Sequence, residues 1–300
     1  MHLILATRRS PLALAQAEIV RTALTARGVS CRLHPLRSSG DKTLDRPLAD
    51  IGGKGLFTKE LDQAVLDGRA HAAVHSMKDM ETTLPDGLAL TAVLPRGDVR
   101  DALIGPWSTI DALPHGAVVG TASLRRQAQL LRRRSDLRVT MLRGNLQTRL
   151  ARLGHGTIDA TVLAMAGLAR MGLLESVAAT ALAPEAFLPA VAQGAIALVC
   201  RTTDDAVQAQ LAPLDHPPSA TRVKAERALL AALDGSCRTP IAGLAQFRAD
   251  GALWLRGLAA SADGVTVRQA ERIGDAADAE RLGRDAGQEL RHRMGSALPR

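Results

Sequence analysis

Aromatic residues, cysteines and long apolar runs are all scarce in this chain of 300 residues. With no Tyr, three Phe and two Trp, it has few side chains that could stack on bases, so a nucleic-acid partner is not expected. Its three cysteines cannot all pair and show no metal-ligand spacing, so a fold held together by disulfides is not expected. Such cysteine usage is typical of a protein in the reducing cytoplasm. No apolar run is long enough to span a membrane, and Gln16, Glu18 and Arg21 interrupt the stretch that would follow a twin-arginine export signal. We therefore expect a cytoplasmic protein without a membrane partner.

Lysine is scarce as well, although the chain is basic. Only five of the 38 basic residues are lysines, and the formal net charge is +8. Arginine binds carboxylate or phosphate through two parallel hydrogen bonds, so the composition favours acidic ligands. Lys54, Lys59 and Lys78 are lysines in a chain that nearly always uses arginine, which indicates a role for the compact charge of an ammonium at these positions.

Strands and helices alternate along the first two thirds of the chain. Ser10 and Pro11 are typical of a helix N-cap and first helical position. After a break near residue 100 the alternation starts again. We expect parallel sheets covered by helices, with strands at 2–7, 31–37, 70–76 and 87–94 and again around "AVVG", "LRVTMLRG" and "DATVLA".

The pattern changes near residue 217. A helix at about 221–233 precedes three runs of alternating polarity, at 241–248, 252–259 and 265–273, which "ADG" turns join into hairpins. A last helix is expected at about 277–292. The chain should therefore form two α/β domains and one smaller antiparallel domain.

Three junctions between a strand and a helix repeat one arrangement of residues. "ATRRSPLA", "GTASLRRQ" and "LRGNLQTR" each place hydroxyl or glycine residues and arginines where a helix begins. Free N–H groups and the positive end of the dipole make such helix starts suitable for anions. The alternative for any one of them is a solvated arginine, and for "LLRRRSD" at 130–136 a solvated helix end is the preferred interpretation.

A second group of polar residues follows the strand at 70–76. Ser76, Lys78 and Asp79 lie at its carboxyl end, where parallel sheets place active sites, and a carboxylate there can stabilise a cation. The alternative is that Asp79 caps a helix. His71 and His75 have the spacing of a helical zinc site, but they lie in a strand without a third ligand, so no metal is expected. The glycine-rich "DIGGKGLFTKE" lacks a phosphate-loop pattern and reads as a lid or a turn carrying Lys54.

A cysteine on a turn completes the set of candidate residues. Cys237 lies in "LDGSCRTPIAG", among small residues just after an apolar helix, whereas free cysteines are usually buried. Together with "ATRRSPLALAQ", "GGKGLFTKEL", "HSMKD", "VGTASLRRQAQL", "LRGNLQTRL" and "LPAVAQGA", its motif "GSCRTPIAG" appears in the order and spacing of one family. Over essentially its full length the sequence resembles the porphobilinogen deaminases, or hydroxymethylbilane synthases.

The resemblance implies a fold class and a domain organisation. It implies two periplasmic-binding-protein-like α/β domains around a cleft, plus a small C-terminal α+β domain with a three-stranded antiparallel sheet and helices. Domain 1 would comprise 1–94 and 195–212, domain 2 would comprise 99–188, and domain 3 would comprise 217–300. The chain would re-enter domain 1 near residue 195, which makes "AIALVC" a strand.

The resemblance also implies an activity and a cofactor. The family condenses four porphobilinogens head to tail into hydroxymethylbilane, with loss of ammonia, on a dipyrromethane primer. That cofactor would be attached through a thioether to Cys237, and a thiolate on an exposed turn suits this attachment. The chain would act as a monomeric transferase of haem biosynthesis.

Roles for individual residues follow from the matched motifs. Asp79, with Lys78, would be catalytic, contacting pyrrole N–H groups and stabilising the cation left when ammonia departs. The residues implied to bind carboxylates of cofactor and substrate, or to lie beside the cleft, are Arg8, Ser10, Lys54, Ser76, Lys78, Thr121, Ser123, Arg125, Arg126, Arg143, Arg149, Arg170, Gln193 and Gly194. Two alternatives stay open: a non-catalytic anion-binding protein, which would not need Cys237, and a nucleic-acid binder.

Overall fold

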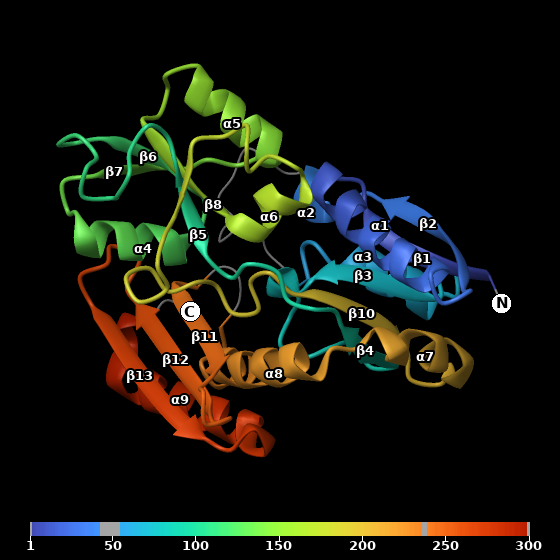
Figure 1. Cartoon of the computed structure of the whole chain (residues 1–300). Coiled ribbons are helices and arrows are strands. Elements are labelled where there is room, and N and C mark those ends of the chain that lie inside the picture. Colours follow the sequence, from blue (N-terminus) through green and yellow to red (C-terminus); the bar gives the residue numbers. More distant parts are fainter. Residues whose placement is uncertain (1, 43–54, 236–238, 299–300) are drawn as a thin grey trace. The chain divides into compact units, whose positions relative to one another are not determined.

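The computed structural model describes residues 2–42, 55–235 and 239–298, and the chain divides into two compact units (Figure 1). The first unit comprises Met1–Arg46, Gly52–Gly97 and Gly194–Ala220, and the second comprises Pro47–Ile51, Asp98–Gln193 and Thr221–Arg300. In the described part of the chain, no helix combines the length and the apolar character needed to cross a membrane. The division into three domains stays a prediction, because the second unit contains both the second α/β sheet and the three-stranded sheet.

The first unit is built on a five-stranded sheet of order β2-β1-β3-β10-β4. Its core consists of aliphatic residues, among them Leu3, Leu5, Val20 and Leu198, which are fully buried between the sheet and its helices. The strands are β1 (His2–Arg8), β2 (Ser30–Leu36), β3 (Ala72–Ser76), β4 (Leu88–Val93) and β10 (Ile196–Arg201), and the helices are α1 (Pro11–Thr25), α2 (Ser39–Lys42), α3 (Lys59–Leu66) and α7 (Asp205–Leu211), with 3-10 turns at Met77–Asp79 and Ala212–Leu214.

The prediction of purely parallel sheets is wrong for both α/β sheets. β1 runs parallel to β2 and β3, but β10 runs antiparallel to β3 and β4. Its position is the one implied for "AIALVC", and it returns to the sheet after a long excursion of the chain rather than through a βαβ crossover. The right-handed crossover that enforces a parallel direction is therefore missing there.

The second α/β sheet has the order β7-β6-β8-β5-β9 and shows the same departure. β5 runs antiparallel to β8 and β9, while β6 runs parallel to β7 and β8. Its elements are β5 (Asp101–Ile104), β6 (Val118–Gly120), α4 (Leu124–Arg133), β7 (Arg138–Thr140), α5 (Leu146–Gly154), β8 (Ala160–Ala164), α6 (Met165–Arg170) and β9 (Ala179–Ala181).

The antiparallel sheet near the C-terminus is confirmed. It comprises β11 (Ile241–Phe247), β12 (Leu253–Ala260) and β13 (Val267–Gly274), and Gly251 and Gly264 take positive φ in its two hairpin turns. α9 (Ala279–Met294) and most of α8 (Pro217–Ala232) lie against one face, where a Cβ at Gly257 would come within 2.3 Å of Leu229 on α8 (Figure 1). The other face packs through Leu258 and Ala260 against Ala128 and Leu188. Two further 3-10 turns, Ala276–Asp278 and Gly295–Ala297, flank α9.

Candidate active site

Two neighbouring parallel strands of the first unit bring Arg8 and Asp79 to one edge of the sheet. Arg8 ends β1, and Asp79 ends the 3-10 turn that follows β3. Arg8 Nη1 lies 3.8 Å from Asp79 Oδ2, and the side chains are 20% and 27% exposed. This distance is an ion-pair contact and too long for a hydrogen bond, so the guanidinium and the carboxylate stand side by side at a surface that solvent reaches.

The interpretation of Asp79 as a helix cap does not hold. Ser76 precedes the turn Met77–Asp79 as its N-cap residue, and Asp79 is the last residue inside the turn. The short turn sets the direction of the carboxylate because it follows a buried strand without any linker. Lys78 and Ser76 are half-buried beside it.

A hollow of about 20 Å³ lies at this edge, lined by Arg8, Phe57, Ser76, Asp79 and other residues of β1, α1, α3 and β3. That volume is about enough for one water molecule and too small for a pyrrole ring. A ring must therefore meet Asp79 from its exposed side. The Arg8 guanidinium is stacked 4.4 Å above the Phe57 ring, a cation–π contact that limits its freedom.

A buried His–Asp pair adjoins the hollow, and His75 is one of the residues that line it. His75 Nε2 on β3 is 3.0 Å from Asp62 Oδ1 on α3, and both side chains are almost fully buried. The pair ties the helix to the strand that carries Ser76, Lys78 and Asp79. Sequence reasoning considered His75 only for a zinc site, which it did not expect, and missed this contact. His71 also has another partner, because its Nδ1 accepts a hydrogen bond from the Ile4 amide at 2.9 Å. Within residues 2–42, 55–235 and 239–298, no three His, Cys, Asp or Glu side chains gather as a metal site would require.

The polar residues at the start of α4, which the sequence predicts to bind an anion, cap the helix. Ser123 is the N-cap and accepts from the Arg126 amide at 3.4 Å, while Thr121 accepts from the Ser123 amide at 3.2 Å. Ser10 caps α1 in the same way, accepting from the Ala13 amide at 3.4 Å.

Arg125 and Arg126 are the buried members of the predicted set. Their side chains are 4% and 6% exposed, and they lie 2.8 and 2.6 Å from the two carboxylate oxygens of the fully buried Asp101. Arg126 also donates to the Val162 carbonyl at 2.7 Å. Burial by itself would raise the pKa of Asp101, but the two positive charges outweigh it and hold that pKa well below its usual range.

Asp101 is a functional candidate that sequence reasoning missed. It opens the apolar strand β5 and also accepts from Gln193 Nε2 at 3.1 Å, so three of its neighbours come from the predicted site. The available signal was an isolated acid in "RDALIG", a segment that is otherwise apolar. The arginines are thus held rigidly by an internal counter-charge, and their role toward a ligand stays a prediction.

The other predicted site arginines of the second unit, Arg143, Arg149 and Arg170, are half-buried. Arg143 precedes α5, whose N-cap is Asn145, and Arg149 Nε donates to the Gly144 carbonyl at 3.0 Å. Burial lowers the pKa of Arg170 at the end of α6. Gly194 is buried, has a φ of +87° and begins the segment that returns to the first sheet. Lys54 and Cys237 lie outside the described residues.

The donor set agrees with a ligand that carries carboxylates and pyrrole N–H groups. Each unit by itself offers guanidinium and hydroxyl donors, and the first unit also has the Asp79 carboxylate, which can accept from N–H. In the described chain, the buried Arg125 Nε has no hydrogen-bond partner. Since a buried donor without a partner is costly, this atom marks a place where an added acceptor is favourable.

Comparison with known proteins assigns the chain to a family. Residues 3–209 match the profile "Porphobilinogen deaminase, dipyromethane cofactor binding domain", and residues 220–292 match "Porphobilinogen deaminase, C-terminal domain". A porphobilinogen deaminase of Paracoccus denitrificans (strain Pd 1222) is 51% identical over 292 residues, which cover 96% of this chain and 93% of that protein.

Similar solved structures include the periplasmic VFT2 domain of BvgS from Bordetella pertussis. It is 14% identical, with a TM-score of 0.41, covering 70% of this chain and 85% of that chain. A periplasmic substrate-binding protein of an ABC transporter from Coxiella burnetii is 13% identical, with a TM-score of 0.43. The match covers 75% of this chain and 96% of that chain. On the two profile matches and the 51% identity over almost its whole length, this chain belongs to the porphobilinogen deaminase family.

Proposed function

We propose that the chain condenses four porphobilinogens head to tail into hydroxymethylbilane, and that Asp79 is the carboxylate on which each step depends. The observation that carries the assignment of Asp79 is its placement beside Arg8 at the carboxyl edge of β1 and β3, partly exposed and outside any capping position. Parallel strands of α/β sheets place catalytic groups at this edge.

Asp79 has two tasks in each condensation. Its oxygens accept hydrogen bonds from the pyrrole N–H of the substrate and so orient the ring. The aminomethyl group leaves in its protonated form: when the bond between its carbon and the ammonium nitrogen breaks, the electron pair goes with the nitrogen, neutral ammonia is released, and a positive charge develops on the substrate ring. A carboxylate next to that charge stabilises it more strongly than it stabilises the neutral ring, which is the requirement for lowering the barrier.

Arg8 and Lys78 bind the carboxylates of the substrate beside Asp79. Each porphobilinogen ring has an acetate and a propionate, and Arg8, held over Phe57, presents a planar fork that can bind either one. Lys78 follows Ser76 in the same turn and adds an ammonium, which binds as a point charge. The buried pair of His75 and Asp62 keeps this turn in place relative to α3.

The dipyrromethane cofactor is attached, in this proposal, to Cys237. When bound, it supplies the primer on which the four substrate units are added. The residues of the second unit that would hold its carboxylates and those of the growing chain are Thr121, Ser123, Arg125, Arg126, Arg143, Arg149 and Arg170. Asp101 fixes the orientation of two of them before any ligand arrives, so little ordering is left for the binding step.

We also propose that the enzyme works as a monomer in the cytoplasm on a small-molecule substrate, without a nucleic-acid or membrane partner. The half-buried Cys31 and the buried Cys200 are free thiols, as a reducing compartment requires. Sedimentation of the purified holoenzyme tests the oligomeric state.

The variant Asp79→Asn tests the central role. Asparagine keeps the size and one acceptor oxygen but lacks the negative charge, so we expect the cofactor to be retained and ammonia release to fall by roughly 10²–10⁴-fold. Asp86→Asn is the matched control, because Asp86 is an exposed aspartate of the same unit outside the hollow. Near-normal turnover by folded, cofactor-bearing Asp79→Asn protein would contradict the assignment.

A further inference from the structure

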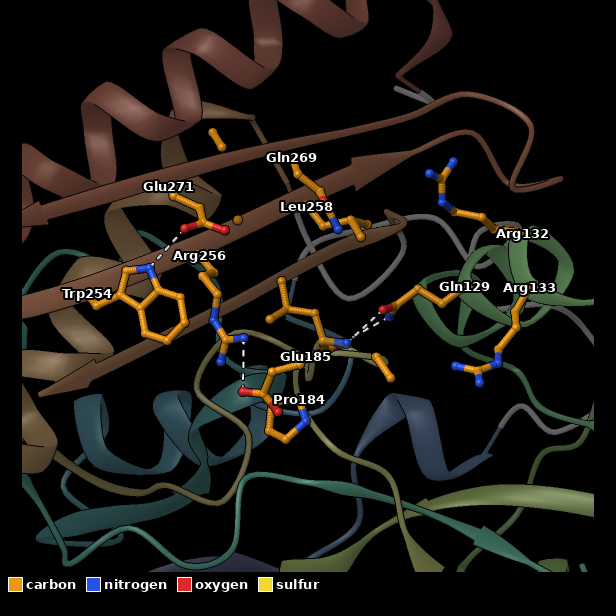
Figure 2. A pocket seen from close by; sticks show the side chains of 14 residues that line it. Gln129, Arg132, Arg133, Pro184, Glu185, Trp254, Arg256, Leu258, Gln269 and Glu271 are labelled. Carbon is orange, nitrogen blue, oxygen red and sulfur yellow. Dashed lines mark hydrogen bonds and ion pairs between the residues drawn. The ribbon is translucent and has the colours of Figure 1, made fainter. Parts of the chain in front are cut away.

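A cavity of about 480 Å³ lies in the second unit, next to the buried Arg125, whose Nη1 donates to the carbonyl of the lining residue Leu188 at 2.9 Å. Its floor is the part of the three-stranded sheet that Ala128 and Leu188 leave uncovered, and its walls are the last turn of α4 and the segment around 184–188 (Figure 2). The volume is that of a small ligand site rather than a packing defect. None of the residues assigned to the condensation reaction lines it.

The two ends of this cavity carry opposite charges. Figure 2 shows Arg132 and Arg133 at one end, on α4, and Trp254 and Glu271 at the other, with Glu185 between them. Arg133 is paired with Asp111 at 2.7 Å, whereas the exposed side chain of Arg132 has no hydrogen bond or ion pair within the described ranges. The cationic end therefore has an arginine available to a carboxylate.

The opposite end is held in place by contacts around Arg256. This guanidinium, 9% exposed, stacks 4.2 Å above the Trp254 ring and donates to Glu185 at 3.1 Å and to Gln246 at 2.6 Å. The Trp254 indole N–H in turn donates to Glu271 at 3.1 Å. The contacts to Glu185 and Glu271 each use one carboxylate oxygen, and a carboxylate offers about four acceptor positions, so both side chains can still accept from a ligand.

The middle of the cavity floor consists of the Leu258 side chain and the main chain of β12 and β13 at Gly257 and Ala270. A Cβ at Gly257 would point to the other face of the sheet, toward Leu229 on α8, so Leu258 supplies the apolar side chain on this face. A planar ring can lie over Leu258, with Trp254 at its edge. From this arrangement of charged and apolar groups along the cavity, we propose that it is a second ligand site for a small aromatic amino-carboxylate. The ligand places its carboxylate at Arg132 and its protonated amine at Glu271 and Glu185.

The proposal is tested by direct binding, with 4-(aminomethyl)benzoate as the probe. This compound has a flat ring with an amine and a carboxylate at opposite ends. The chain has two tryptophans, so holoenzyme with Trp107→Phe reports on Trp254 alone. We expect a saturable change in its fluorescence with a Kd of about 1 mM, the scale reached by a ligand of this size. Calorimetry on the unaltered holoenzyme gives a second reading that does not depend on the Phe variant.

Two kinds of control separate this site from general ion binding. Benzoate and benzylamine each lack one of the two charges, and we expect the Kd of each to be at least about tenfold higher than that of 4-(aminomethyl)benzoate. Arg132→Gln and Glu271→Gln should each raise the Kd by about three- to tenfold. Arg138→Gln, which removes an exposed arginine of the same unit outside the cavity, should leave it unchanged.

Several results would overturn the proposal. These are the absence of saturable binding by both readings, equal binding of the singly charged compounds, or equal affinity of the cavity variants and Arg138→Gln. Because binding is measured without turnover, none of them bears on the role of Asp79.

Discussion

Replacing Asp101 by Asn should destabilise the second unit more than any change of a surface charge. The carboxylate is fully buried and balances two buried guanidiniums, at 2.8 Å from Arg125 and 2.6 Å from Arg126. Asparagine keeps one acceptor oxygen for Gln193 but leaves both buried arginines charged without a counter-charge. Breaking a buried ion pair from one side in this way costs about 3–5 kcal/mol.

That cost is large against the total stability of the protein. The free energy of unfolding of a protein domain is about 5–15 kcal/mol, so the variant loses a substantial share of it. For a unit of this size, each kcal/mol corresponds to about 2–4 °C in Tm, which predicts a fall of about 6–20 °C for Asp101→Asn. Calorimetry or near-UV circular dichroism of the purified protein measures it.

Asp98→Asn is the matched control for this experiment. Asp98 lies three residues earlier and pairs with Arg100 at 2.6 Å, but these side chains are 29% and 44% exposed. Pairs of this kind contribute about 0–1 kcal/mol, so its Tm should fall by only a few degrees at most. If the two variants have the same Tm, the reasoning from burial is refuted.

The pH dependence of the same group provides an independent check. The folded state holds the pKa of Asp101 below the value of about 3.9 that the unfolded chain has. The contribution of its charge to stability is therefore complete above about pH 4 and is lost as the pH falls further, toward the folded pKa. The difference in Tm between the unaltered protein and Asp101→Asn should be constant from neutral pH down to about pH 5 and shrink only in stronger acid.

Three further changes test other parts of the molecule. Cys237→Ala should yield folded protein without the dipyrromethane adduct, and an intact mass that still contains it would place the attachment elsewhere. Arg143→Leu should weaken substrate binding or stall elongation, because losing a charge-assisted contact to a buried carboxylate costs roughly 2–5 kcal/mol. The control variant Arg138→Leu, at an exposed arginine, should turn over substrate normally. Gly264→Ala should lower the stability by at least about 2 kcal/mol more than Gly251→Ala: both glycines have positive φ, but only at Gly264 would the new Cβ lie 2.3 Å from a backbone oxygen of α4. Equal losses in the two alanine variants would show that the main chain of α4 moves aside easily.

Local patterns in the sequence were enough for much of this protein. The alternation of strands and helices, the hairpins at the "ADG" turns and the cap at Ser10 depend on neighbouring residues, and the structure confirms them. The order of seven motifs predicted the family, which the comparisons confirm. The candidate residues around Asp79 could be found because they follow directly on one strand.

Other features were decided only by the tertiary structure. The two faces of a strand show in its pattern of polarity, but the direction in which it pairs does not, so the antiparallel β5 and β10 could not be read from their own residues. The pairing of Asp101 with Arg125 and Arg126, and of Asp62 with His75, joins residues from separate elements. So does the cavity around Arg256, which forms where α4 and the segment at 184–188 leave part of the sheet uncovered. A buried charge needs a partner within a few ångströms, and the sequence shows that such a charge exists but not which element brings the partner.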